Sequence, residues 1–243
     1  MCQYKSGIID IDKNVYVDNS TDSHERLKVI FDLDSNDKDL VRWEIVPKDE
    51  LRITKDRRDW QFIVDEWNVP RWLSPTHIEK CWEAWEEAIK EEIYIDESVK
   101  IVKDRRVWYM ENATVSEVKG KSEIVRMAGH SIIEKLLGKT NVYHMYNYSM
   151  IKEARDRTRI WTMHNYSTVF ELCDEAKIKA MFGDSRVCIA RDRSRIRTMY
   201  NDSVVDFLMG DSVIENLLGH SMVRHIVERG TVKCKNDTSV VVL

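Results

Sequence analysis

A nine-residue repeat runs without a gap from Asn112 to Glu228, in thirteen consecutive units. Position two of each unit is small, position four is always Val or Ile, and position nine is Gly, Asn or Asp until Glu228. Nine residues make about two and a half helical turns, so helices would point the apolar positions of successive units in opposite directions. In a strand, positions two and four share one side, and Gly, Asn or Asp at position nine suits a corner. The repeat predicts a β-solenoid.

Position seven shows that one coil takes two units. Methionine occupies it in alternate units, at Met127, Met145 and Met163, whereas the units between have residues such as Leu136 and Ala154. The structural period is therefore eighteen residues, and stacking at about 4.8 Å per strand predicts roughly seven coils. A methionine column at this spacing is typical of core packing rather than of a metal or cofactor site.

Composition changes near residue 100. The net charge is −9 for residues 1–102 and +5 for residues 103–243, and six of the eight tryptophans lie in the first part. Alternating segments at 7–11, 14–18, 40–46 and 60–66 predict strands, while 23–31 and the segment after Ser74 predict helices. We predict an α+β capping domain at 1–97 followed by the solenoid at 98–243.

The ends of the solenoid depart from the repeat. Val99, Val107 and Val115 follow an eight-residue step, which predicts an irregular entry, and the same step from Val232 to Val240 predicts an irregular tail. An uncovered terminal coil offers unpaired strand edges. The apolar residues within 238–243 predict either a homodimer seam or a cap within the chain.

Basic residues collect around one corner of the predicted coil. Such a column is suited to a phosphate backbone, with outward Tyr143 and Trp161 adding stacking. The interleaved acids favour the alternative, in which the charges pair across strands and keep an edge soluble. These acids are Asp156, Asp174, Glu175 and Asp192. The candidate partner-binding residues are Arg155, Arg157, Arg159, Lys177, Lys179, Arg191, Arg193, Arg195 and Arg197.

One set of residues suggests chemistry. Cys2 follows the initiator methionine, and an N-terminal cysteine combines a thiol nucleophile with a nearby amine; His24 and Glu44 are candidates for general acid and base. The alternative is that Cys2 is simply a small residue, His24 packs beside a turn and Glu44 is an ordinary strand residue. The five cysteines are scattered, which predicts free thiols and no metal site, and no cofactor is predicted. No run of eighteen apolar residues or signal-peptide pattern occurs, so we expect no membrane association and a cytoplasmic location in a host cell.

The segments MCQYKSGII, DSHERL, VRWEIVPKD and WQFIVDE resemble the start of uncharacterised proteins from bacteriophages of gut bacteria. Units such as NATVSEV are similar to repeats that follow in some of them. The resemblance covers most of the chain and implies a phage or mobile-element source without implying an activity.

Two classes of function remain open. The first is a non-enzymatic scaffold or binding module whose solenoid presents a surface to a host or phage protein, with nucleic acid a further possible partner. The second is an enzyme that uses Cys2 as its nucleophile, with the solenoid serving oligomerisation or substrate capture.

Overall fold

The computed structural model describes residues 4–34, 38–50, 53–236 and 238–242. The chain divides into two compact units, Met1–Ile93 and Tyr94–Leu243, and each is considered by itself. The predicted division into independent domains at residue 97 stays a prediction. The capping role of the N-terminal domain also stays a prediction. Among the described residues, neither helix has the length and apolar character that a membrane span requires.

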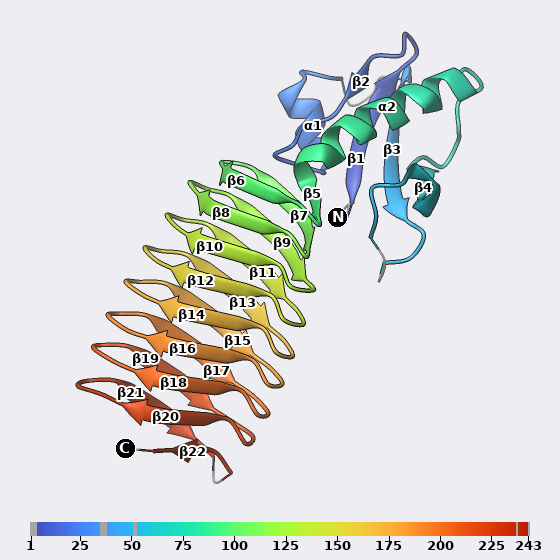
Figure 1. The fold of residues 1–243 in the computed structure, drawn as a ribbon. Helices are drawn as coiled ribbons and strands as arrows, with labels where there is room; N and C mark the ends of the chain where they lie inside the picture. The colour runs from blue at the N-terminus through green and yellow to red at the C-terminus, as the bar shows by residue number, and fades with distance from the viewer. Residues whose placement is uncertain (1–3, 35–37, 51–52, 237, 243) are drawn as a thin grey trace. The chain divides into compact units, whose positions relative to one another are not determined.

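The first unit is an antiparallel sheet with helices, as predicted (Figure 1). The strand order is β2-β1-β3-β4, with β1 at Lys5–Asp10, β2 at Val15–Tyr16, β3 at Leu40–Pro47 and β4 at Trp60–Val64. Residues of β3 alternate between buried and half-buried, which places Trp43 in the core, fully buried. The helical segments are α1 (His24–Ile30), the 3-10 turn η1 (Arg57–Asp59) and α2 (Pro75–Glu92).

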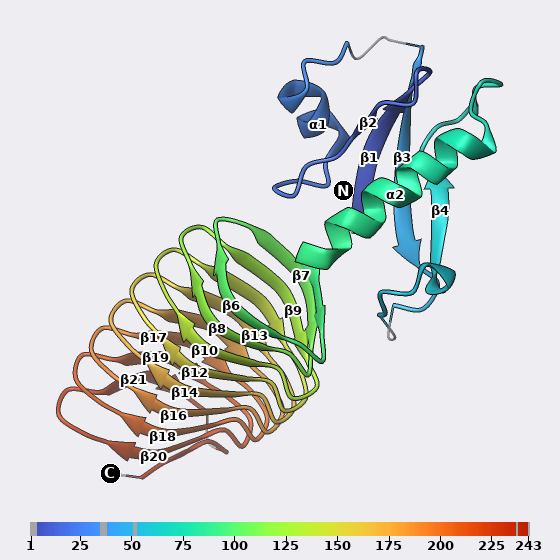
Figure 2. The ribbon, with the colours of Figure 1, turned by 45° about the horizontal axis from the view of Figure 1, so that its top comes forward.

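The second unit is a β-solenoid made of two parallel sheets (Figure 2). Successive strands of the chain alternate between the two sheets. We call the sheet of even-numbered strands the even sheet and the sheet of odd-numbered strands the odd sheet. The even sheet contains β6 (Ser98–Lys103), β8 (Thr114–Lys119), β10 (Ile132–Leu136), β12 (Met150–Ala154), β14 (Thr168–Leu172), β16 (Arg186–Ala190), β18 (Val204–Leu208), β20 (Met222–Ile226) and β22 (Val240–Val241). The odd sheet contains β5 (Ile93–Ile95), β7 (Arg106–Glu111), β9 (Glu123–Ala128), β11 (Asn141–Met145), β13 (Arg159–Met163), β15 (Lys177–Met181), β17 (Arg195–Met199), β19 (Val213–Leu217) and β21 (Thr231–Lys235).

The register confirms the predicted eighteen-residue coil. Met145 pairs with Met163, Met163 with Met181 and Met181 with Met199, so the methionines lie directly over one another in the odd sheet. Each of these side chains is fully buried. Position four supplies the neighbouring column, in which Val142 pairs with Ile160. The core of the solenoid is therefore a stack of layers with equivalent positions in register.

The corners confirm the role of position nine. Asn147, Asn165 and Asp156 have φ angles of 57°, 56° and 58°, in the left-handed region that Asn and Asp tolerate better than most residues. Side chains at position nine also join neighbouring coils, since Asp156 Oδ2 accepts a hydrogen bond from the backbone N–H of Gly138 at 2.7 Å, and Asp174 Oδ2 accepts one from the backbone N–H of Asp156 at 3.1 Å. Each corner is thus fixed both by backbone conformation and by its neighbour.

The two ends differ from each other. At the entry, Val99 pairs with Val115 and Val107 with Ile124, so the first coil is shorter than eighteen residues. At the tail, Val241 pairs with Val223, eighteen residues away, and packs against the core, whereas Val240 is 42 % exposed. The predicted eight-residue step from Val232 to Val240 is therefore wrong, because the nine-residue step continues to Val241.

These end segments lengthen the solenoid beyond the predicted seven coils. In the described part of the chain each sheet has nine strands, which span roughly 38 Å from first to last. The tail strand β22 extends the even sheet of its own chain through β20. A homodimer seam at 238–243 stays a prediction.

Candidate functional site

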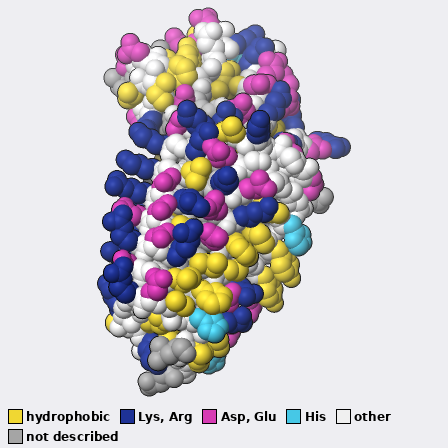
Figure 3. Space-filling model, turned by 60° about the vertical axis from the view of Figure 1, so that its left-hand side comes forward, with side chains coloured by type: hydrophobic (Ala, Val, Ile, Leu, Met, Phe, Trp, Pro, Cys, Tyr) yellow, Lys and Arg dark blue, Asp and Glu magenta, His cyan; other side chains and the backbone are white. Residues whose placement is uncertain are grey.

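Four of the predicted basic residues lie at the corner that leads from the even sheet to the odd sheet. This corner set consists of Arg155, Arg157, Arg191 and Arg193. Arg157 and Arg193 both contact Glu175, at 3.2 and 2.9 Å, and Arg191 contacts Glu171 at 3.2 Å. Arg155 pairs with Glu153. Lys and Arg side chains alternate with acidic ones along an edge of the solenoid (Figure 3). At this corner the basic residues pair with acidic ones, as the second of the two interpretations of the sequence predicts.

The other five basic residues lie on the outer face of the odd sheet. This face set consists of Arg159, Lys177, Lys179, Arg195 and Arg197. All five side chains are exposed, and none takes part in an ion pair among the described residues. The strand pairing stacks them in two adjacent columns. Arg159 pairs with Lys177, and Lys177 with Arg195, in the first column. The second column has Lys179 and Arg197, two positions further along the same strands.

The two columns carry an electrostatic cost. Like charges directly opposite each other on neighbouring strands destabilise a sheet, by an amount of the order of a few tenths of a kcal/mol to about 1 kcal/mol per pair. Lys177 lies between two arginines of the same sign. Two residues earlier in the same coil, the chain has Glu175 between Arg157 and Arg193. Each member of the corner set therefore takes part in an ion pair, whereas no member of the face set does so among the described residues.

A shallow hollow of about 230 Å³ lies among the face set. Ile160, Ile178 and Trp161 supply apolar lining, and Glu215 is an acidic residue in its wall. The faces of the Trp161 ring are occupied within the chain. Tyr143 stacks on it with a centroid separation of 5.7 Å, and Lys179 Nζ lies 4.6 Å from the ring centroid. The hollow thus offers cations around an apolar floor, without a free aromatic platform.

A second surface of the solenoid carries stacked aromatic rings that the sequence analysis did not single out. His130, Tyr148 and Tyr166 stack at 5.1 and 5.2 Å, one ring per coil at position one. Tyr148 and Tyr166 are each more than half exposed. The same eighteen-residue spacing that revealed the methionines marks this column in the sequence. Because the rings cover one another, the column presents mainly ring edges.

In the first unit the structure brings His24 and Glu44 together. One ligand atom from each, and one from Asp65, all lie within 4.8 Å of one another. His24 begins α1 and is 5 % exposed, Glu44 is half-buried in β3, and Asp65 directly follows β4. Cys2, the predicted nucleophile, lies outside the described residues. Asp65 was missed because nothing in its sequence surroundings distinguishes it from other surface acids.

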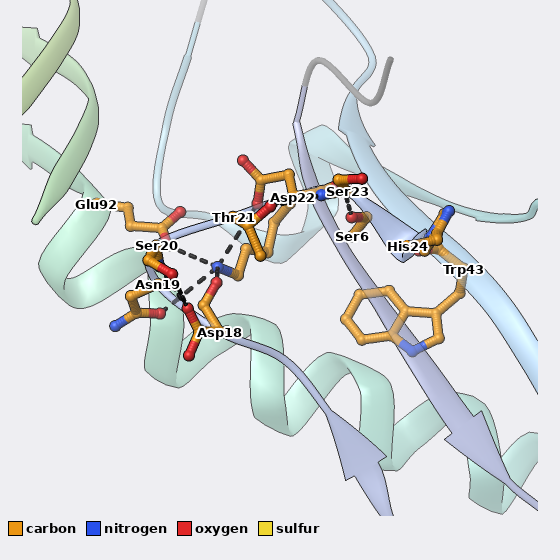
Figure 4. Close-up of polar contacts among 11 residues, drawn as sticks. Ser6, Asp18, Asn19, Ser20, Thr21, Asp22, Ser23, His24, Trp43 and Glu92 are labelled. Atoms are coloured by element: carbon orange, nitrogen blue, oxygen red, sulfur yellow. Dashed lines mark hydrogen bonds and ion pairs between the residues drawn. The ribbon is translucent and has the colours of Figure 1, made fainter. Parts of the chain in front are cut away.

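His24 is held by a backbone hydrogen bond. Its Nε2–H donates to the carbonyl oxygen of Trp43 at 3.1 Å (Figure 4). Its Nδ1 lies 3.3 Å from Asp65 Oδ2. Trp43 is fully buried in the sheet, which makes its carbonyl a fixed acceptor. The ring orientation therefore points Nδ1 towards the Asp65 carboxylate.

A buried lysine lies in the same unit, and the sequence analysis did not identify it. Lys5 Nζ is 2.6 Å from Glu92 Oε1 and 3.6 Å from Asp22 Oδ1, and donates to the carbonyl oxygen of Asp18 at 2.9 Å (Figure 4). Lys5, Glu92 and Asp22 are each less than 9 % exposed. An ammonium group held by two carboxylates is a structural ion pair that joins β1 to α2, rather than an available nucleophile.

Comparison of the chain with protein-family models, with curated proteins and with solved structures finds no match. The resemblance to bacteriophage proteins stays a prediction.

Proposed function

We propose that the protein is a non-enzymatic binding module whose solenoid presents the face set to an acidic segment of a protein partner. The observation that carries the proposal is the column of like charges Arg159–Lys177–Arg195, with Lys179 and Arg197 beside it, none of which takes part in an ion pair among the described residues. Glu215 lies beside Arg197 on the next strand and limits the column of Lys179 and Arg197 on that side. A bound anion would remove this repulsion. Local rules of stability are commonly broken at functional sites, which supports the assignment.

The chemistry of the hollow favours a peptide segment over a nucleic acid. Proteins that bind single strands without sequence preference stack bases on aromatic rings, and Trp161 is already covered by Tyr143 and Lys179. The apolar lining from Ile160 and Ile178 suits an apolar side chain flanked by carboxylates. With a volume of about 230 Å³, the hollow is smaller than the roughly 300–1,000 Å³ that is usual for small-molecule sites.

The solenoid also provides rigidity for such a surface. The face set lies on strands that pair on both sides, and their inward residues Ile160, Ile178 and Ile196 are at most 1 % exposed. A pre-ordered surface loses little conformational entropy on binding. The proposal that the module comes from a phage or a mobile element depends only on the sequence resemblance described above.

The test uses two fluorescent probes of equal formal charge, an acidic peptide containing leucines and a single-stranded oligothymidylate. Anisotropy is measured with the full chain and with a Lys177→Glu variant, at low and physiological salt. We expect the peptide to bind, and the variant to weaken binding at least tenfold. Preferential binding of the oligonucleotide would favour a nucleic-acid partner instead, and equal binding by both proteins would remove the face set from the function.

The alternative enzymatic function stays a prediction that depends on Cys2. A Cys2→Ala variant that keeps its binding and its biological effect would exclude that role.

A further inference from the structure

We propose that His24, Glu44 and Asp65 form a binding site for a divalent transition-metal cation, for which Zn²⁺ is the natural probe. The site lies within the first unit and does not depend on the proposed function of the solenoid. Three residues distant in sequence converge there, from the start of α1, from β3 and from the residue after β4. Imidazole nitrogen and carboxylate oxygen are ordinary zinc ligands.

The spacing of the ligand atoms suits one ion. Zinc–ligand bonds of about 2.0–2.2 Å in a tetrahedral site place neighbouring ligand atoms about 3.4 Å apart. His24 Nδ1 and Asp65 Oδ2 are 3.3 Å apart, and all three ligand atoms lie within 4.8 Å of one another. Glu44 is half-buried and Asp65 is exposed, so the proposal requires these two carboxylates to rotate towards the ion.

The hydrogen bond from His24 to Trp43 provides a second argument. Because Nε2 donates its proton to the Trp43 carbonyl oxygen, the neutral ring carries its lone pair on Nδ1, the atom that lies next to the Asp65 carboxylate. Metal-binding histidines usually donate their other ring N–H to a carbonyl or carboxylate, which fixes the ring and its tautomer. Here the acceptor is backbone of a buried strand residue, and the ring itself is 5 % exposed.

Charge also favours a cation. A neutral imidazole and two carboxylates give the site a formal charge of −2. The nearby guanidinium of Arg42 is engaged by Glu66, with Nε donating to Oε1 at 2.9 Å and Nη2 donating to Oε2 at 3.3 Å. A divalent ion would therefore neutralise the two carboxylates without displacing that ion pair.

The site has access to solvent on one side. Asp65 lines a surface hollow of about 400 Å³ together with Arg42, Val64, Glu66 and Trp67. Three protein ligands beside open space is the arrangement of zinc sites that keep a coordination position for water or another ligand. We infer that the fourth position faces this hollow.

The experiment is calorimetric titration of Zn²⁺ into the chelator-treated full chain, compared with Asp65→Asn, Glu44→Gln and the control Asp12→Asn. Asp12→Asn removes the same charge from an exposed turn of the same unit. We expect the wild type and the control to bind one equivalent, and both ligand variants to bind at least tenfold more weakly. Circular dichroism in the presence of chelator verifies that each variant is folded.

Substitution of Co²⁺ gives an independent measurement, because nitrogen and oxygen ligation in a tetrahedral site produces a visible absorption band. We expect this band in the wild type and the control and its loss in Asp65→Asn. Wild-type zinc binding that both ligand variants retain would place the ion elsewhere, for example at the exposed Cys234, and would overturn the proposal. Absence of stoichiometric binding by the wild type would overturn it equally.

Discussion

Glu175 and Lys177 lie two residues apart in the same coil, and each lies between two arginines. Glu175 contacts Arg157 and Arg193 at 3.2 and 2.9 Å, whereas Lys177 pairs in register with Arg159 and Arg195. The first set of three therefore contains a carboxylate that pairs with both arginines, whereas the second set contains three positive charges. This contrast provides matched substitutions with opposite expected signs.

Lys177→Glu should stabilise the protein while it weakens binding at the face set. The new carboxylate would lie between Arg159 and Arg195, replacing two repulsive contacts with attractive ones, and we expect an increase of roughly 0.5–1 kcal/mol in the free energy of unfolding. Chemical denaturation measures it. Lys100→Glu, at an exposed position of β6, is the control and should change stability by less than about 0.5 kcal/mol. Destabilisation by Lys177→Glu would contradict the repulsion argument.

Glu175→Lys should have the opposite effect. It removes the carboxylate shared by Arg157 and Arg193 and adds a third positive charge to that column. We expect a decrease of roughly 0.5–1 kcal/mol in the free energy of unfolding, and this decrease should shrink at high salt because exposed charges are screened. A loss of stability that salt does not change would point to packing instead.

Asn165 should tolerate Gly but not Val. Its φ of 56° lies in the left-handed region, where a β-branched side chain costs about 1–2 kcal/mol. Asn165→Val should lower the free energy of unfolding by about that amount, and Asn165→Gly should change it little. Asn141→Val is the matched control, since Asn141 begins strand β11, where valine is favoured. Equal effects of valine at both positions would remove the conformational explanation.

Acidification from about pH 7.5 to about pH 5.5 should destabilise the solenoid through His164. Its ring stacks between Tyr146 and Phe182 at 4.9 and 5.0 Å, and burial lowers the pKa of His164, with a smaller contribution from His144. The unfolded chain therefore binds the proton more readily than the folded chain. This stability is present above the unfolded pKa near 6.5 and is lost as the pH falls towards the lower folded pKa.

Melting temperatures across that pH range measure the effect. His164→Phe keeps an aromatic ring in the stack and should reduce the pH dependence, whereas His220→Asn, at an exposed corner, should leave it unchanged. An undiminished pH dependence in His164→Phe would assign the effect to other groups, His144 first among them because burial lowers its pKa as well.

Thiol reagents should distinguish the cysteines by burial. Burial raises the pKa of Cys81 to about 12 and that of Cys173 to about 11, and both side chains are fully buried, so neither thiolate forms or is reached at neutral pH. Cys234 is exposed. Maleimide labelling followed by mass spectrometry should modify Cys234 in the native protein, and Cys81 and Cys173 only after denaturation. Rapid native labelling of Cys81 would show that α2 opens readily.

Most of the solenoid was predictable because its information is local and periodic. The identity of Met163 as a core residue follows from the residues eighteen positions before and after it, and its pairing confirms this. The tail was not predicted correctly, because three consecutive valines, Val240 to Val242, do not by themselves show which one points into the core. Extension of the nine-residue frame identifies Val241, which pairs with Val223. Periodicity thus predicted the layers but not their termination.

The candidate sites were predictable only in part. The nine basic residues were identified as one group, since the distinction between a corner and a sheet face depends on which neighbours pair in register. His24 and Glu44 were named from their chemistry, whereas Asp65 joins them only through the folding of the antiparallel sheet. The Lys5–Glu92 pair joins residues that are 87 positions apart in sequence, a contact with no local signal.

The constant pairing interval of eighteen residues restricts how the solenoid can change in height. Duplication of one full coil would leave every later residue in its own column and add roughly 4.8 Å. Duplication of a single nine-residue unit would instead transfer all later strands to the opposite sheet, so that Arg195 would no longer continue the column of Lys177. Addition of whole eighteen-residue coils therefore preserves a continuous charged face, whereas addition of a single nine-residue unit within it does not.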